Sequence, residues 1–440
     1  MTPPRSRTAH RSVALLGALL LPLGLAACTG SETDDDVEDT TARPASVALG
    51  ATAASGEAAA EPLSATLGVV VTLRSRRGEG SDQRFGAAGA QLAAYRMSLG
   101  EAEVDLEVVD DDGTTAGARD AVASLVEAGV AGIVVASQGE HLSEALADAA
   151  DAGVPVLLPY DRRDTLPDGV WQTGPSASAV DAALLEALRA DGHESPYVVT
   201  ADGLEVDGVG SADGATYRPG RAGQVVRRAL DALDTGSADA VVVAGSASTQ
   251  ADLVARFAGV GADTAVPLYL SPEALSPAFP RALVDEADAL VGGLVSVGVD
   301  ASDATTLQRG EQGDGAAAFF AALRLADQDP DLTGLLGSGD FAAGDADTAS
   351  HDAVVALVRA VETAGSAEPD AVAAALEGLT LDTSDGLVGA ALDFSRDRAL
   401  ADDAVVTLVA TTQDPGVRPG GADAPRLFWF AVEESPTAGE

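Results

Sequence analysis

Short apolar runs alternate with Ala-rich segments of helical periodicity through the first half of the chain. The apolar runs cover residues 67–73, 104–109, 132–136 and 154–158. The segments between them, where apolar residues recur every three or four positions, cover residues 86–97, 115–127 and 142–151. This alternation predicts a parallel, doubly wound α/β sheet. Ligands of such sheets bind at the carboxyl ends of the strands, so we expect function in the loops that follow the strands.

The composition narrows the classes of partner. The 440 residues are enough for two lobes with separate cores, and only 4% of them are aromatic, so Ala, Val and Leu must fill the interior. The formal net charge is −43, and all 26 basic residues are arginine. So acidic a chain cannot neutralise phosphates, which disfavours nucleic acid as a partner. Cys28 is the single cysteine, which excludes a disulfide within one chain.

The N-terminal residues have the pattern of an export signal. Three arginines precede an apolar run over residues 13–25, which is too short to span a bilayer comfortably. The run ends in Leu-Ala-Ala directly before Cys28, which resembles the bacterial lipoprotein signal; an ordinary signal peptide with a chance cysteine is the alternative. We predict a signal peptide over residues 1–27, lipidation of Cys28 and attachment to the extracytoplasmic face of the cell membrane. Residues 28–64 are predicted to form a flexible tether.

Local patterns occur along the chain in the order of one known family. They include residues 68–71 with 86–95, 104–113, 118–136, 149–159, 169–176, 238–245, 268–273 and 350–354. The series resembles the type I periplasmic-binding proteins, the extracellular solute receptors of ABC importers, and within them the Leu/Ile/Val-receptor group. The resemblance covers most of residues 65–434. It implies two doubly wound, Rossmann-like lobes joined by a three-segment hinge, which the family uses to close on a ligand.

The resemblance also implies how the chain divides between the lobes. The first lobe is expected to comprise residues 65–176 and 299–385, and the second residues 177–298 and 386–436. Segment 201–214 is Gly- and Asp-rich and too short for the helix and the further strand that the family has there. We therefore expect a trimmed second lobe.

Further elements follow from the same periodicities. Predicted helices cover residues 177–189, 222–233, 249–258, 316–325, 351–363 and 369–376. Predicted strands cover residues 197–200, 240–244, 266–270 and 290–297. Three late strands, at 386–394, 404–411 and 426–432, are expected to return to the second lobe.

The ligand site of the family's amino-acid receptors is mostly absent from this sequence. The hydroxyl that follows their third strand falls near Gly139, beside Ser137 and Gln138. Their threonine after the fourth strand falls on Arg162, and their aspartate at the first crossing falls on Ala177. These differences disfavour a branched-chain amino acid as the ligand.

The second lobe keeps one residue of that site. Glu273 matches the glutamate that holds the ligand amine in the family. Ser246 and Ala247 stand where an aromatic ligand contact is expected. The resemblance therefore implies a ligand contact for Glu273 but no aromatic contact.

Arginines take the place of the missing site. They are Arg74, Arg76, Arg77 and Arg84 in or just after the first loop, and Arg162 and Arg163 after the fourth strand. The topology places both loops at one edge of the sheet, and guanidinium groups bind carboxylate or phosphate in a bidentate manner. This pattern predicts an acidic ligand, such as a dicarboxylate. The alternative is that the arginines are solvated or pair with the local carboxylates, which are Glu79, Asp82, Asp161 and Asp164.

No catalytic constellation is visible in the sequence. It has no G-x-S-x-G elbow, no P-loop and no zinc-protease helix. His141, His193 and His351 lie on separate predicted elements without metal-ligand spacing. His351 stands where the family often has a tyrosine near the cleft, so a ligand contact there is one interpretation. We predict no enzymatic activity, no metal and no cofactor.

These observations predict a lipid-anchored extracellular receptor that binds a small polar molecule, an amino acid or an organic anion, and serves an ABC permease. The candidate ligand-binding residues are Arg74, Arg76, Arg77, Ser137, Gln138, Gly139, Asp161, Arg162, Ser176, Ser246 and Glu273. The alternative is a degenerate family member that acts as a surface sensor or protein-interaction module without a transported ligand. A deep pocket lined by Arg74, Arg162 and Glu273 would favour the receptor. A cleft filled by the protein's own side chains would favour the alternative.

Overall fold

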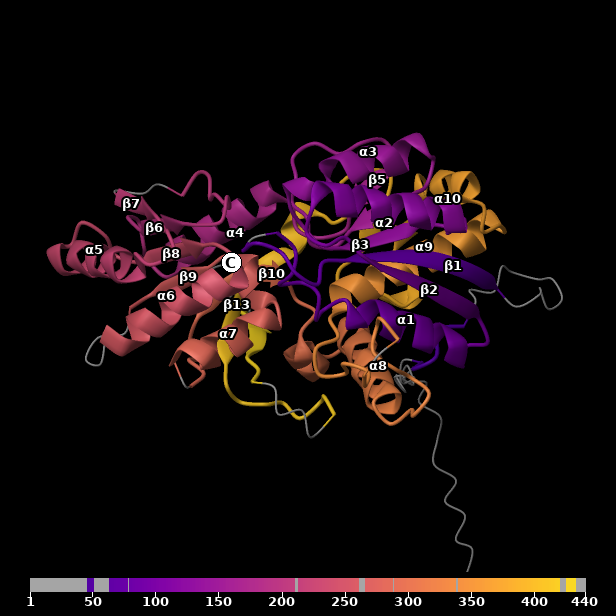
Figure 1. Ribbon diagram of the computed structural model, residues 1–440. Helices are drawn as coiled ribbons and strands as arrows, with labels where there is room; N and C mark the ends of the chain where they lie inside the picture. Colours follow the sequence, from indigo (N-terminus) through magenta and orange to yellow (C-terminus); the bar gives the residue numbers. More distant parts are fainter. Residues whose placement is uncertain are drawn as a thin grey trace, which may run out of the picture. The chain divides into compact units, whose positions relative to one another are not determined.

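The computed structural model describes residues 46–50, 63–77, 79–209, 213–260, 266–287, 289–337, 339–419 and 425–432. The predicted signal peptide, Cys28 and most of the predicted tether lie outside the described residues. The predicted α/β class is confirmed, because the described part of the chain holds two large sheets that are mostly parallel and are covered by helices (Figure 1).

Five parallel strands form the sheet of the first lobe, in the order β2-β1-β3-β4-β5. The strands are β1 (Ser64–Val71), β2 (Glu103–Asp110), β3 (Ile133–Ala136), β4 (Val156–Leu158) and β5 (Val170–Gln172). The helices that connect the first four are α1 (Ala88–Leu99), α2 (Thr115–Ala128) and α3 (Ser143–Asp151). Parallel neighbours require such crossovers. The sequence pattern predicted each of these three helices and each of the first four strands in its observed place.

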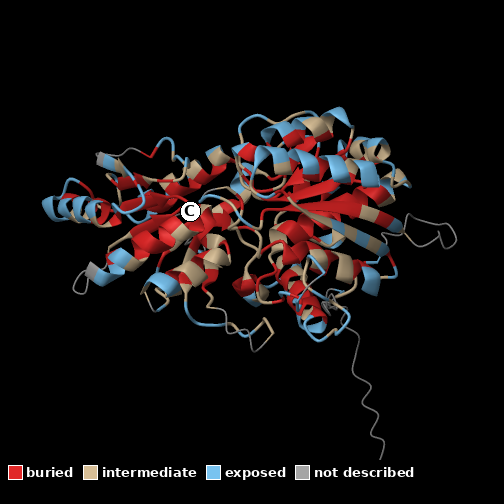
Figure 2. Ribbon diagram, viewed as in Figure 1, coloured by how far each residue is buried: buried red, intermediate tan, exposed pale blue. Residues whose placement is uncertain are grey.

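Successive residues of the strands face opposite sides of this sheet, as the pleat requires. In β1, Val69 and Val71 pack into the apolar cluster that also holds residues of α1 and α9 (Thr348–Ala364), whereas Val70 packs with residues of α2 and α3. The central strands β1, β3 and β4 are therefore apolar on both faces, whereas the edge strand β2 alternates acidic and apolar residues, and Figure 2 shows buried residues concentrated along the central strands. This is why the central strands read as continuous apolar runs rather than as an alternation.

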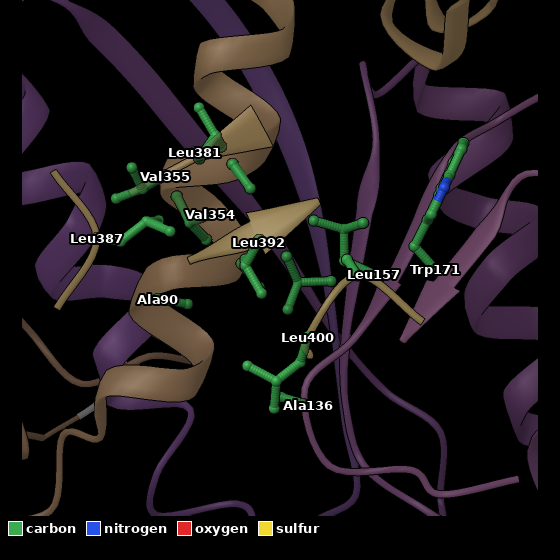
Figure 3. Packing of buried hydrophobic residues seen from close by; sticks show 14 of the residues in the cluster. Ala90, Ala136, Leu157, Trp171, Val354, Val355, Leu381, Leu387, Leu392 and Leu400 are labelled. Carbon is green, nitrogen blue, oxygen red and sulfur yellow. The ribbon is translucent and has the colours of Figure 1, made fainter. Parts of the chain in front are cut away.

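Late segments of the chain complete the first lobe. They are α8 (Glu311–Ala326), α9 and α10 (Pro369–Leu376). Every residue of α9 from Ser350 to Val361 is buried, because α1, α10 and the sheet all pack against this helix. Figure 3 shows Val354 and Val355 of α9 close to Leu381 and Leu392 in the same cluster.

Seven strands form the sheet of the second lobe, in the order β14-β13-β10-β9-β8-β6-β7. The strands are β6 (Tyr197–Thr200), β7 (Asp213–Thr216), β8 (Val241–Ala244), β9 (Leu268–Leu270), β10 (Val295–Val299), β13 (Val405–Thr411) and β14 (Phe428–Ala431). The helices between them are α4 (Ala177–Ala190), α5 (Ala222–Thr235), α6 (Ala247–Val260) and α7 (Ala278–Ala287). Strands β13 and β14 run antiparallel to their neighbours, whereas the others are parallel.

The structure differs from the sequence analysis at three of these segments. The described part of segment 201–214, residues 201–209, contains no helix, in agreement with the expected trimming, but a further strand is present: β7 begins at the end of the segment and pairs in parallel with β6. The stretch 386–394 does not join the second sheet: its strand β12 (Leu392–Asp393) pairs with β11 (Thr380–Leu381) in a separate two-stranded sheet. Helix α7 was not predicted, because Pro280 reads as a breaker although proline is tolerated in a first helical turn.

Short 3-10 helices follow several strands and position the loops at the sheet edges. They are η1 (Glu140–Leu142), η2 (Pro272–Leu275), η3 (Asp303–Leu307), η4 (Thr383–Asp385) and η5 (Asp402–Ala404). The chain passes between the two sheets after β5, after β10 and before β13. These three passages agree with the hinge that the family resemblance implies.

Candidate functional site

A cavity of about 250 Å³ lies between the two lobes. The first lobe contributes Gln138 and Tyr160 from loops after its strands, and the second contributes Ser276 and Trp429. The wall is built from strand ends, the loop before α9 and the entry to β14. Ligand sites of open α/β sheets are expected at such strand ends.

An ion pair across the cavity joins the lobes. Arg162 follows β4, and its Nη2 donates to Oε1 of Glu273 in η2. The second carboxylate oxygen of Glu273 accepts from the Ser271 hydroxyl at 2.5 Å. The Glu273 side chain is only 2% exposed and that of Arg162 is 15% exposed, so the pair is largely withdrawn from water.

A second carboxylate, that of Asp347, lines the cavity and is held by hydrogen bonds. The Tyr160 hydroxyl donates to Asp347, which also caps α9 by accepting from the Ser350 N–H at 2.9 Å. Burial raises the pKa of the Asp347 carboxyl and raises the pKa of the Tyr160 phenol well above its usual value. A Cβ at Gly86 would lie 2.2 Å from Oδ2 of Asp347, so the close approach requires glycine there.

Arginines and aspartates form the wall on the side of β14. Arg418 binds Asp303 with both arms, at 2.7 and 3.0 Å, and also donates to the carbonyls of Gly344 and Ala346. Asp345 accepts from Arg281 at 2.6 Å. A further arginine, Arg426, lines the same wall. Charged groups of both signs therefore surround the cavity.

The loop between β1 and α1, residues 72–87, reaches from the first lobe to the second. The Asp82 carboxylate accepts from the N–H of Ala247, at the start of α6, at 2.8 Å. The backbone carbonyl of Asp82 accepts from the Ser276 hydroxyl at 2.5 Å. The Nη1 of Arg77 lies 3.4 Å from the Tyr217 hydroxyl and 3.5 Å from that of Thr249. The Asp82 carboxylate thus occupies the positive end of a helix dipole.

We expect Asp82→Asn to change how stability depends on pH. The pKa of Asp82 is raised, mainly by burial. The nearby carboxylates of Glu273 and Asp202 also raise it. The backbone hydrogen bond from Ala247 and the charge of Arg84 act in the opposite direction. Because the folded-state pKa is raised, the folded state binds the proton more tightly, and its stability falls as pH rises through that pKa. The amide keeps an acceptor for Ala247 and removes the charge, so the variant should be more stable than the parent at about pH 7 but not at about pH 4.

The measurement for Asp82→Asn is urea unfolding at both pH values. Asp234→Asn, which changes an exposed carboxylate on α5, is the matched control. The expectation is contradicted if the difference in the free energy of unfolding between Asp82→Asn and the parent protein is no larger at about pH 7 than at about pH 4.

The structure separates the six arginines of the predicted basic cluster. Arg76 is exposed and pairs with Glu79, whereas Arg163 binds Asp161 with two arms, at 2.9 and 2.8 Å. Arg74 is exposed, and the guanidinium of Arg84 lies 4.3 Å from the ring centre of Phe85. Arg162 lines the cavity, whereas Arg74, Arg76 and Arg77 are not among the lining residues. The alternative interpretation, that the arginines are solvated or pair with local carboxylates, therefore describes the exposed Arg74 and the paired Arg76 and Arg163.

In the loop after β3, Ser137 bonds to another loop of the first lobe, whereas Gln138 lines the cavity. The Ser137 hydroxyl is buried and lies 2.5 Å from that of Thr72, while Gln138 lines the cavity. The N–H of Gly139 donates to Asp161 at 3.0 Å, and its φ of +127° is a conformation that favours glycine.

Two predicted serines have structural partners at helix starts. Ser176 caps α4 by accepting from the N–H of Ala179 and donates to Asp402, both at 3.0 Å. The hydroxyl of Ser246 donates to Asp202 at 2.7 Å. Neither Ser176 nor Ser246 is among the lining residues of the cavity.

The histidines do not form a site. His351 is fully buried between Arg96 and Asp352, with ring-nitrogen distances of 3.0 and 2.7 Å, so the suggested ligand contact is wrong. His141 pairs with Asp111 at 2.9 Å. In the described part of the chain, no group of three His, Cys, Asp or Glu side chains could hold a metal ion.

Several lining residues were missed by sequence reasoning. They are Tyr160, Asp303, Asp345, Asp347, Arg418 and Arg426. Most belong to late segments without regular periodicity, so nothing in the sequence connected them with the first four strands. The proximity of Tyr160 to the predicted fourth-strand loop was the one available signal.

Comparison with solved structures identifies the fold. A periplasmic binding protein type 1 from Bordetella pertussis Tohama I is 17% identical, with a TM-score of 0.60 over 84% of this chain and 100% of that one. The branched-chain amino acid transporter substrate-binding protein LivJ from Streptococcus pneumoniae, in complex with isoleucine, is 16% identical, with a TM-score of 0.59 over 79% of this chain and 96% of that one.

A third structure, an ABC transporter substrate-binding protein from Desulfitobacterium hafniense complexed with Leu, is 18% identical, with a TM-score of 0.56 over 79% of this chain and 98% of that one. The chain therefore has the type I periplasmic-binding-protein fold, as its sequence patterns suggested. No family model matches the chain, and no curated protein matches its sequence. None of the helices in the described ranges has both the length and the apolar character needed to cross a membrane.

Proposed function

We propose that this protein is an extracytoplasmic solute receptor of an ABC importer, held at the cell membrane by a lipid on Cys28. The observation that carries the proposal is the cavity between the lobes, which both lobes line with charged side chains. Ion-pairing groups that converge on an inter-lobe cavity suit a small polar solute. The fold is shared with proteins described as ABC transporter substrate-binding proteins, two of them in complex with amino acids.

The proposed mechanism is closure of the lobes around the solute. Arg162 and Glu273 pair with each other across the cavity. A solute with a carboxylate, or with both a carboxylate and an ammonium group, offers each of them an alternative partner. Only a solute that binds the closed arrangement more tightly than the open one shifts that equilibrium. The proposal involves binding without chemistry.

The first test is a thermal-shift screen of the purified protein against amino acids, organic acids, short peptides and sugars. A solute at a hundred times its dissociation constant should stabilise the folded state by about 2.7 kcal/mol. A hit that weakens in Glu273→Gln or Arg162→Gln supports the inter-lobe site. No shift across a broad library would contradict the receptor proposal.

The contacts of residues 72–87 favour a second candidate, a surface sensor or interaction module without a transported ligand. Asp82 and Arg77 contact the second lobe directly, so part of the cleft is filled by the protein's own side chains. If this candidate is right, no solute binds to the Asp82→Ala variant or raises its melting temperature. If Asp82→Ala instead allows or strengthens solute binding, the loop competes with the solute and the receptor proposal is favoured.

A further inference from the structure

The charges around the cavity are almost completely paired within the protein. The lining residues that carry charge are Arg162, Glu273, Asp303, Asp345, Asp347, Arg418 and Arg426. The pairs Arg162–Glu273 and Arg418–Asp303 account for four of them. Asp345 pairs with Arg281 and Asp347 accepts from Tyr160. Among these described lining residues, Arg426 is the one without such a partner.

The guanidinium of Arg426 is partly buried as well as unpaired. Its Nε and Nη2 are buried and have no hydrogen-bond partner among the protein atoms. Burial lowers the pKa of Arg426, and the nearby charge of Arg418 lowers it further, while Asp303, Asp345 and Asp414 act in the opposite direction. Asp303 and Asp345 are already bound by other arginines, at 2.7 and 2.6 Å.

Two buried guanidinium nitrogens without an acceptor are costly, and arginine does not relieve the cost by losing its proton. The five N–H groups of a guanidinium match the two oxygens of a carboxylate. The acceptor that the wall lacks is therefore an anion from outside the protein.

The rest of the wall indicates what that anion is attached to. The residues next to Arg426 in the chain, Pro425, Leu427, Phe428 and Trp429, line the cavity, and so do Leu275 and several prolines from other segments. Such a surface is stabilised by covering it with apolar groups. A sugar or an inorganic anion would leave it unmatched.

We propose that the cavity binds an organic anion with an apolar body, whose carboxylate pairs with Arg426. This inference rests on the proposed receptor function and adds the class of ligand and the residue that selects it. This residue, Arg426, is not one of the arginines that the sequence analysis singled out. It lies at the entry to β14.

The test measures binding of matched acid and amide pairs, each with an aliphatic, alicyclic or aromatic body, such as benzoate and benzamide. The acids should bind at least about tenfold more tightly than their amides, because a charged hydrogen-bond partner is lost in the amide. Arg426→Gln should weaken the acids by a similar factor and leave the amides unchanged. Arg228→Gln, which changes an exposed arginine on α5, should do neither.

The stability of the unliganded protein provides a second readout. A purely structural arginine would destabilise the fold when replaced, whereas Arg426→Gln removes an unpaired buried charge and should melt at the same or a higher temperature. A clearly lower melting temperature, or acid binding that Arg426→Gln leaves unchanged, would overturn the proposal.

The remaining outcomes separate this inference from the receptor function. If an amide, a sugar or a cation binds in the cavity and the acids do not, the inference fails while the receptor stands. If inorganic phosphate binds as tightly as the acids, the apolar body is wrong. If no solute of any class binds, the proposed function fails together with the inference.

Discussion

Replacing Arg162 with alanine is expected to destabilise the folded protein by about 3 kcal/mol, because it leaves the Glu273 carboxylate buried without its cationic partner. Glu273 is 2% exposed in the pair, so water does not replace the guanidinium while the lobes stay together. The Ser271 hydroxyl still donates to Glu273, which compensates only in part. Chemical unfolding at neutral pH measures the difference.

The matched control for Arg162→Ala is Arg76→Ala at the same edge of the sheet. Arg76 also pairs with a glutamate, Glu79, but its side chain is 87% exposed, and exposed pairs of this kind contribute little. Combining Arg162→Ala with Glu273→Gln should recover most of the lost stability, since no unpaired carboxylate remains. Equal effects of Arg162→Ala and Arg76→Ala would contradict the expectation.

Arg162→Ala has a second outcome, in which the two lobes separate. Small-angle scattering detects it. If the lobes separate in Arg162→Ala, Glu273 is hydrated and the loss of stability becomes small. The radius of gyration from small-angle scattering would then increase. That result would assign the ion pair to holding the closed arrangement rather than to global stability.

Replacing Gly89 with alanine is expected to have an effect of similar size in the first lobe. A Cβ at Gly89 would lie 1.9 Å from the backbone carbonyl oxygen of Asp347 and 2.6 Å from the hydroxyl of Ser350. The carbonyl belongs to the backbone and cannot turn away, so α1 must move from α9. Overpacking of this kind costs up to about 3 kcal/mol.

Gly223→Ala on α5 is the control for Gly89→Ala. A Cβ there meets only Nη1 of Arg227, at 3.8 Å, so the substitution should stabilise the helix by about 0.5–1 kcal/mol. Thermal unfolding of both variants measures the contrast. A Gly89→Ala protein that melts with the parent would mean that the two helices are not in close contact.

The fold could be predicted from the sequence where burial imposes periodicity. The central strands of the first lobe are apolar on both faces and therefore read as continuous runs, such as residues 132–136. Prediction failed where local chemistry misleads. Strand β7 is only four residues long, with a glycine among them, and Pro280 conceals the start of α7.

The candidate site was harder to predict than the fold, for a physical reason. Strand order places Arg162 and Glu273 at facing edges, and both line the cavity. Topology does not determine which side chains pair, so the mutual bond of these two residues was not foreseen, whereas the bond of Arg163 to Asp161 agrees with the alternative interpretation of the arginines. Arg426 lies more than 250 residues along the chain from Arg162, and no local pattern connects them.

The place of α9 in the first lobe has a consequence for how the chain matures. The five strands of that lobe end at Gln172, but the helix that covers one face of β1 and β3 begins only at Thr348. Until that helix arrives, α1 alone of these two helices is present to cover the face of the sheet that holds Val69 and Val134. During synthesis the second lobe therefore emerges while the first is unfinished, and the partly exposed apolar face must be protected from aggregation until residue 364 has followed.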